Sequence, residues 1–352
     1  MLSSAASSGN IKLAAANTET TKTKDENNSI IYPEELKRIL TDKKSSSFVL
    51  GRSEQGRKIE AFFFPGSSDK KALVIGGVHG SELSSIEVTS QLVQQLMSNE
   101  RIYYSVIVVP SLFPDNAETA KQFTQQIGDV NNIGRYSYPG AVDPNRQMPT
   151  PGKSFDDEHE LDHVGRKVET ENTLLLKLIE EYRPQRIVSL HAIRDINHAG
   201  VFADPRTDHN SIALGYNSDS SLAVSMAMYI YQSGGYIPGN QLIKRPTTLY
   251  HKDPEPVAAG QFQKRNFKGS LFSGQRGGGI SLGTWASTAI MAENDPSKNR
   301  DAMRILTMEF PGSKRPADYK TKAEQSFWQR QIELYAAGIQ NIFLQEYFVE
   351  EN

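Results

Sequence analysis

The sequence predicts an α/β fold with a largely parallel sheet that is covered by helices on both faces. Short, continuous apolar runs such as KALVIGG and QRIVSLHA have the length and composition of strands that are buried on both sides. Longer segments with the apolar spacing of helices alternate with these runs. Such alternation is typical of sheets whose neighbouring strands run parallel.

Each element follows from its own pattern of residues. YPEELKRIL predicts a helix with a proline at its start, and ETENTLLLKLIEEY predicts a helix that Pro184 ends. The complete set comprises helices at 32–40, 81–99, 169–182, 223–232 and 323–348, and strands at 58–64, 71–77, 103–111, 185–192 and 304–310. The remainder of 204–285 is rich in glycine and proline, so we expect long loops above the sheet there.

The chain is expected to consist of a leader and one domain. Residues 1–30 contain eighteen Ser, Ala, Asn or Thr and show no hydrophobic period, which predicts a disordered leader. This leader lacks the charged and apolar regions of a signal peptide. Residues 31–352 have the size of a single domain.

Composition excludes several functional classes. A net charge of −2 argues against binding to nucleic acid or to an anionic membrane surface. No apolar run reaches the ~20 residues of a membrane span. Because there is no cysteine, any transition metal must be held by carboxylates and the seven histidines. The polar leader and the missing cysteines favour the periplasm or secretion, although a cytoplasmic protein fits the same composition.

The segment DDEHELDHVG contains the metalloprotease motif H-E-x-x-H, from His159 to His163. A zinc-binding helix of that type needs largely uncharged, apolar neighbours around the motif. Here Asp162 precedes the second histidine and SFDDE precedes the first, and neither histidine follows a predicted strand. We therefore expect a solvated acidic turn without a metal.

Residues that can bind a metal instead follow three predicted strands. His79 and Glu82 come directly after one strand, and His191 ends another. Ligands of open α/β sheets bind at the carboxyl ends of the strands. Two histidines and a carboxylate leave a position on zinc for a water molecule. Each histidine alone would more often be structural, so the prediction depends on the three residues meeting.

Glu309 ends a third predicted strand, RILTMEF. A carboxylate in an apolar strand is costly to bury without a partner, which argues against a purely structural role. A carboxylate next to zinc can take the proton of a water molecule whose pKa the metal has lowered.

Four motifs, GVHGSE, GAVDPNRQMP, SLHA and TMEFPG, resemble in their order those of the zinc carboxypeptidase family (carboxypeptidase A-like). The chain is most similar to the compact bacterial branch that includes murein peptide amidases, from about Gly56 to the C-terminal helix. The resemblance implies a mixed, mainly parallel eight-stranded sheet flanked by helices, and one zinc ion per chain. It also implies that His79, Glu82 and His191 are the zinc ligands and that Glu309 is the general acid and base.

The same resemblance assigns residues to substrate binding. Asn145 and Arg146 match the pair that binds the terminal carboxylate of the substrate, a task for which a planar guanidinium is suited. Arg135 lies near the place of the arginine that polarises the scissile carbonyl and stabilises the oxyanion. The specificity wall should include 279–283, with Gln275 and Arg276 nearby.

The sequence departs from the family pattern at two places. Larger members have a tyrosine ahead of the segment that aligns at Trp285, and this chain has none there, with Tyr250 as a conceivable replacement. FPDN at 113–116 replaces the commoner N-P-D-G, a change that we interpret as structural.

These assignments predict a zinc-dependent exopeptidase that hydrolyses a C-terminal peptide or amide bond with a Glu309-assisted, zinc-bound water. Murein stem peptides are one substrate class. An aspartoacylase- or desuccinylase-like amidohydrolase acting on N-acyl amino acids is the alternative, but in those relatives the catalytic glutamate lies much nearer the last ligand. A non-catalytic zinc- or peptide-binding module is a third interpretation, against which the complete set of ligands and base argues.

Overall fold

The structure is a computed structural model that describes residues 32–98, 101–127, 132–137, 141–242, 278–292 and 295–346. The predicted leader at 1–30 lies outside these residues, as do Tyr250, Gln275 and Arg276. Within the described part of the chain, no helix has the length and apolar character needed to cross a bilayer.

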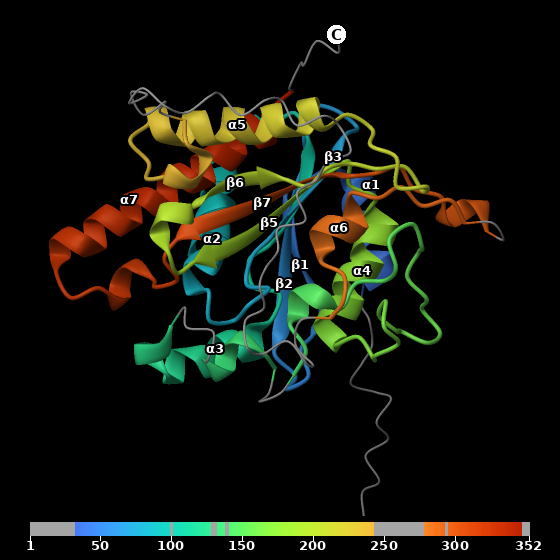
Figure 1. Cartoon of the computed structure of the whole chain (residues 1–352), viewed down its shortest axis with the longest axis horizontal. Helices are drawn as coiled ribbons and strands as arrows, with labels where there is room; N and C mark the ends of the chain where they lie inside the picture. Colours follow the sequence, from blue (N-terminus) through green and yellow to red (C-terminus); the bar gives the residue numbers. More distant parts are fainter. Residues whose placement is uncertain are drawn as a thin grey trace, which may run out of the picture.

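A seven-stranded mixed sheet forms the centre of the described residues, and helices lie on both of its faces (Figure 1). The strands are β1 (Ser46–Arg52), β2 (Lys58–Phe64), β3 (Lys71–Ile75), β4 (Ser105–Val109), β5 (Arg186–Ile193), β6 (Gly200–Ala203) and β7 (Arg304–Pro311). The helices are α1 (Tyr32–Asp42), α2 (Leu83–Met97), α3 (Pro114–Gln122), α4 (Thr170–Tyr182), α5 (Tyr216–Gln232), α6 (Leu282–Ala286) and α7 (Lys322–Gly338).

The strand order is β1-β2-β4-β3-β5-β7-β6. β4, β3, β5 and β7 are mutually parallel and form the middle of the sheet, whereas β1, β2 and β6 pair antiparallel towards its edges. The predicted mixed α/β fold is confirmed. The described residues form seven strands where the resemblance implied eight, and parallel pairing is confined to the four central strands.

All the predicted helices and strands are present, and four further elements appear that the sequence did not predict. β1 and β6 are edge strands of seven and four residues, and α3 is a polar helix without an apolar stripe. α6 has only five residues and lies, like the first part of α5, in a region where we expected loops. Residues 243–277 of that region lie outside the described residues.

The sheet separates two hydrophobic cores. Leu73, Ile187 and Ile305 point to the face on which α1, α4 and α6 pack. The residues next to them in the sequence point to the opposite face, which α2, α5 and α7 cover. In Figure 1, α5 and α7 lie together on one side of the sheet, and α4 and α6 lie on the other. Because side chains alternate along a strand, residues two positions further along β5 and β7 share the first face.

One buried carboxyl group makes the stability of the fold depend on pH. Glu171 lies in the first turn of α4 and is only 4% exposed. Burial raises the pKa of Glu171 to about 7, although hydrogen bonds from the backbone oppose this shift more weakly. The folded state is therefore favoured when Glu171 is protonated and disfavoured when it is ionised. Its effect on stability is therefore favourable at low pH and is lost as the pH rises from about 4.5 to about 7.

We expect Glu171→Gln to increase the free energy of unfolding at pH 8 by about 1–3 kcal/mol, since a neutral amide avoids the cost of ionising a buried group. The gain should be smaller at pH 5, where the folded protein already holds the proton. Urea titrations at both pH values measure this difference. An equal or larger gain at pH 5 would contradict the assignment.

Candidate metal centre and active site

The turn after β3 places His79 and Glu82 at the carboxyl edge of the sheet. Gly77 adopts a φ of +65°, a left-handed conformation that favours glycine. Gly80 packs directly on α3, because a Cβ built on it would lie 2.3 Å from the backbone carbon of Asn116. The FPDN segment therefore supports the turn, in agreement with the structural role that we expected for it. α2 begins at Leu83, immediately after Glu82.

Two neighbouring strands bring His191 and Glu309 to the same edge. β5 and β7 are parallel, and their register pairs His191 with Glu309. In the antiparallel pairing on the other side of β7, Gly200 of β6 lies opposite Glu309. Ser189 and Thr307 form the next pair on the same face.

The structure brings His79, Glu82 and His191 together as a group that could hold a metal ion. One ligand atom from each residue lies within 4.8 Å of the others, and all three side chains are buried. The Nδ1 atoms of His79 and His191 are 3.3 Å apart. Oε1 of Glu82 lies 2.9 Å from Nδ1 of His79, and Oε2 lies 3.1 Å from Nδ1 of His191. Three electron-rich atoms thus converge on one small volume.

The remote nitrogen of each histidine is held by a neighbour. Nε2 of His79 lies 2.8 Å from Oδ1 of Asp143, and Nε2 of His191 lies 3.1 Å from the hydroxyl of Ser189. Partners of this kind fix the orientation of metal-binding imidazoles and increase their basicity. The sequence analysis missed both residues, although Asp143 directly precedes the Pro-Asn-Arg segment and Ser189 lies two residues before His191.

The electrostatics of the cluster favour a positive charge. Burial and Arg135 both lower the pKa of His79, but Glu82 and Asp143 outweigh them and raise it to about 9. Burial alone would raise the pKa of Glu82, yet His79 and Arg135 hold it well below its ordinary value. Two imidazoles and a carboxylate form the donor set of catalytic zinc sites, so these residues fit a zinc ion.

Glu309 has the environment of a proton acceptor. Its side chain is half-buried, and in the part of the chain that the structure describes no hydrogen bond or ion pair reaches its carboxyl group. Burial raises the pKa of Glu309, and the charge of Glu82 acts in the same direction. A carboxylate with a raised pKa accepts a proton more readily than an exposed one.

Arg135 lies against the cluster. It ends a short 3-10 helix, Ile133–Arg135, and its Nη1 donates to Oε1 of Glu82 at 2.6 Å. The buried Nε of Arg135 has no hydrogen-bond partner among the described residues. The side chain therefore keeps one donor free beside the place where the three ligand atoms meet.

Asn145 and Arg146 lie in a second short 3-10 helix, Pro144–Arg146, which Asp143 connects to the cluster. Oδ1 of Asp143 accepts from the backbone N–H of Asn145 at 2.8 Å and also contacts His79. The side-chain oxygen of Asn145 accepts from the N–H of Leu282 at 3.0 Å, which ties this helix to the start of α6. Nη1 of Arg146 donates to the carbonyl of Asn145 at 2.6 Å.

The sequence profile of the zinc carboxypeptidase family (Peptidase_M14) matches residues 35–217, more than half of the chain. The chain belongs to this family. The predictions of a zinc-dependent peptidase and of zinc as its cofactor are thereby confirmed. No curated protein sequence matches the chain.

Solved structures of carboxypeptidases are similar to this chain in fold. Carboxypeptidase A from Helicoverpa armigera is 13% identical, with a TM-score of 0.50 over 87% of this chain and 71% of that chain. The metallo-carboxypeptidase from Pseudomonas aeruginosa is 15% identical, with a TM-score of 0.49 over 88% and 68%. Murein-tripeptide amidase MpaA from Escherichia coli O157 is 17% identical, with a TM-score of 0.41 over 87% and 94%. At these identities the similarity concerns the fold alone.

The H-E-x-x-H segment of this carboxypeptidase forms turns and an isolated bridge, with no helix. His159 contacts Oδ2 of Asp156 at 2.7 Å, and His163 contacts the hydroxyl of Thr150 at 2.9 Å, both at the surface. Within the described residues, the group that could hold a metal contains neither histidine. The exposure of the two histidines agrees with the solvated turn that we expected.

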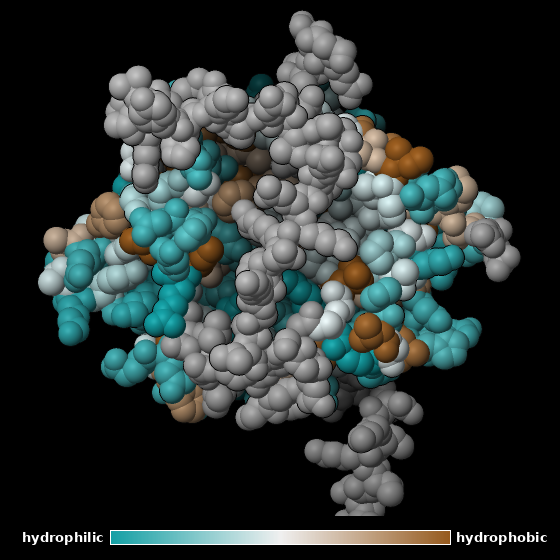
Figure 2. All heavy atoms as spheres, in the orientation of Figure 1, coloured by the Kyte–Doolittle hydropathy of each residue, from teal (hydrophilic) through white to brown (hydrophobic). Residues whose placement is uncertain are grey.

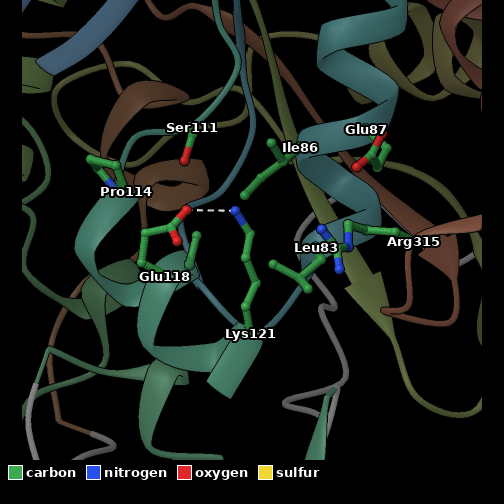
Figure 3. A pocket seen from close by; sticks show the side chains of 9 residues that line it. Leu83, Ile86, Glu87, Ser111, Pro114, Glu118, Lys121 and Arg315 are labelled. Carbon is green, nitrogen blue, oxygen red and sulfur yellow. Dashed lines mark hydrogen bonds and ion pairs between the residues drawn. The ribbon is translucent and has the colours of Figure 1, made fainter. Parts of the chain in front are cut away.

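A separate pocket of about 220 Å³ lies between α2 and α3 (Figure 3). Its two cationic groups are already paired, Lys121 with Glu118 and Arg315 with Asp318.

The uncovered parts of the molecular surface in Figure 2 are mainly hydrophilic, with hydrophobic residues only singly or in small groups. Isolated apolar residues of this kind are normal on a protein surface.

Proposed function

We propose that this chain is a metallo-exopeptidase that removes the C-terminal residue of a peptide, with His79, Glu82 and His191 as the zinc ligands. The observation that carries the proposal is the meeting of these three side chains at the edge of the sheet where Glu309 lies on the adjacent strand β7. We propose further that residues 31–352 act as one catalytic domain, preceded by the leader.

Zinc, when bound, supplies a Lewis acid that polarises a carbonyl oxygen and lowers the pKa of a water molecule. Glu309 takes the proton of the attacking water, and it returns that proton to the nitrogen of the leaving amine. The free Nε of Arg135 can donate to the carbonyl oxygen of the scissile bond, where negative charge develops. Donors that are already oriented in this way need no reorganisation during the reaction.

Asn145 and Arg146 would hold the terminal carboxylate and thereby make the enzyme an exopeptidase. Their helix is fixed on one side by Asp143, which also contacts His79, and on the other side by Leu282. The carboxylate site is therefore rigidly connected to the metal site. A planar guanidinium can bind a carboxylate with two parallel hydrogen bonds.

Murein stem peptides are the substrate class that we favour among C-terminal peptides, because the motifs resemble those of the compact bacterial branch. The zinc-loaded enzyme should be incubated with murein tripeptide, with a library of peptides that carry varied C-terminal residues, and with N-acyl amino acids. Mass spectrometry of the products should show the loss of one C-terminal residue. Release of acyl groups alone would instead support the amidohydrolase.

The same screen tests the carboxylate site through Arg146→Ala. Without the guanidinium we expect kcat/KM for free C-terminal carboxylates to fall by about 30-fold or more, since a charged pair loses one partner. For peptides with an amidated C-terminus, the same substitution should change kcat/KM little. An equal loss for both kinds of peptide would contradict the assignment of Arg146.

A further inference from the structure

The loop that contains the H-E-x-x-H segment holds an arginine against the proposed carboxylate site. Nη2 of Arg166 donates to the backbone carbonyl of Arg146 at 3.0 Å and to that of Gly278 at 2.7 Å. We propose that Arg166, fixed by Asp162, is a positioning residue that orients Arg146 for the terminal carboxylate of the substrate. This inference rests on the proposed function and gives the loop a role in substrate binding.

Asp162 determines the direction of the Arg166 side chain. The carboxylate of Asp162 is only 1% exposed, and its Oδ1 accepts from the backbone N–H groups of Val164 and Arg166, both at 2.9 Å. Its Oδ2 accepts from Nε of Arg166 at 2.6 Å. One carboxylate thus binds both the backbone and the side chain of Arg166. The outer end of the planar guanidinium therefore points in a fixed direction, towards the two carbonyl groups.

The loop is also joined to the chain that follows Arg146. The backbone N–H of His163 donates to the carbonyl of Met148 at 3.1 Å, and the N–H of Met148 donates to the carbonyl of Ile280 at 3.2 Å. Three segments that are distant in the sequence therefore lie side by side. Arg166 links all three, because its side chain reaches from the loop to the backbone of the other two segments.

Gly279 shows how closely the segments approach. A Cβ built on Gly279 would collide with the carbonyl oxygen of Arg146 and would lie 2.7 Å from Nη2 of Arg166. The gap is therefore too narrow for a side chain at this position. At the other end of the same segment, the N–H of Leu282 donates to the side chain of Asn145 at 3.0 Å. Both proposed carboxylate-binding residues are thus held against one segment, Asn145 by Leu282 and Arg146 through Arg166.

The charges indicate that Arg166 acts through Arg146. Asp162 neutralises the charge of Arg166 at contact distance. The guanidinium of Arg146 donates to the carbonyl of Asn145 and has no salt bridge within the described residues, so its charge is available to a substrate anion. Without Arg166 the carbonyl of Arg146 loses this donor, and the short helix that carries Arg146 can shift. A displacement of about 1 Å in a positioning group can cost about 100-fold in rate.

The test is a double-mutant cycle that combines Arg166→Gln with Arg146→Ala. Glutamine cannot span Asp162 and the two carbonyl groups. For a peptide with a free C-terminal carboxylate, we expect Arg166→Gln to raise KM by about tenfold or more, while kcat stays within about threefold of wild type. The KM of the amidated peptide should change little. In the Arg146→Ala background, Arg166→Gln should have no further effect on kcat/KM, because a residue that acts through another adds nothing in its absence.

Arg183→Gln is the matched control. Arg183 also donates to backbone carbonyls of a distant segment, those of Ser297 and Asn299, but it ends α4 and precedes β5, at the edge of the sheet opposite His191. This variant should keep the wild-type KM. Zinc content should be unchanged in all the single variants, which shows that each variant is folded.

Arg166→Lys separates orientation from charge. Lysine keeps a positive charge beside Asp162 but lacks the planar fork that reaches the carboxylate and both carbonyl groups. We therefore expect Arg166→Lys to retain most of the increase in KM. Asp162→Asn provides a second route to the same effect, because the amide oxygen still accepts from the backbone while the ion pair with Arg166 is lost. Its KM should rise for the free carboxylate alone.

A wild-type KM in Arg166→Gln, or its full recovery in Arg166→Lys, would overturn the inference and leave the proposed function standing. Additive losses in the double variant would also overturn it, because they would mean that Arg166 acts on the substrate independently of Arg146. If the wild-type enzyme cleaves no peptide at all, the proposed function fails and this inference falls with it. If Arg166→Gln does not fold, Asp162→Asn in the same cycle decides the question.

Discussion

Glu309→Gln should leave zinc bound and lower kcat by about a thousandfold, within the range that general acid–base catalysis contributes. The amide keeps the shape of the side chain but cannot take a proton from water. Glu309 lies beside His191 in the register of β5 and β7, and within the described residues its carboxyl group has no hydrogen bond or ion pair that the amide would break. Zinc content by elemental analysis and kcat on a C-terminal peptide give the two readouts.

Glu87→Gln is the matched control for this experiment. Glu87 is also half-buried, and burial also raises its pKa, but it lies on α2 and lines the pocket between α2 and α3. This variant should keep both zinc and kcat. If Glu309→Gln turned over substrate at the wild-type rate, another group would have to be the base.

His191→Ala should lose zinc affinity by more than about a hundredfold. Loss of a residue that only orients a metal-binding side chain already lowers metal affinity 10–100-fold, and His191 itself contributes an atom that could bind the metal. Asp143→Asn should lower zinc affinity within that 10–100-fold range, because it leaves all three ligand atoms in place and weakens the contact with Nε2 of His79. Titration of the metal-free variants with zinc measures both effects.

The double variant His159→Ala, His163→Ala is the control for the metal site. Both histidines lie at the surface, where the side chain of His159 contacts Asp156 and the side chain of His163 contacts Thr150. Zinc content should be unchanged. Loss of zinc in this double variant, or one full equivalent of zinc in His191→Ala, would contradict the assignment of the metal centre.

The sequence predicted the central part of the fold, because a strand buried on both faces is mainly apolar along its length. β3, β4, β5 and β7 carry that signal, and α2, α4 and α7 have helical apolar spacing. β1 and β6 lie at the edges of the sheet, and α3 is a polar helix. Their formation depends on the elements that they contact more than on their own composition, so local patterns did not reveal them.

The sequence also determined the candidate metal ligands, since His79 and Glu82 follow one apolar strand, His191 lies near the end of another, and parallel strands end at a common edge. Only the tertiary structure decided that Asp143 and Ser189 hold the two imidazoles. The contact between Asp143 and His79 joins segments that are distant in the sequence, whereas Ser189 and His191 are close together on β5. Their geometry depends on register and packing across the sheet, which the order of residues along one segment does not encode.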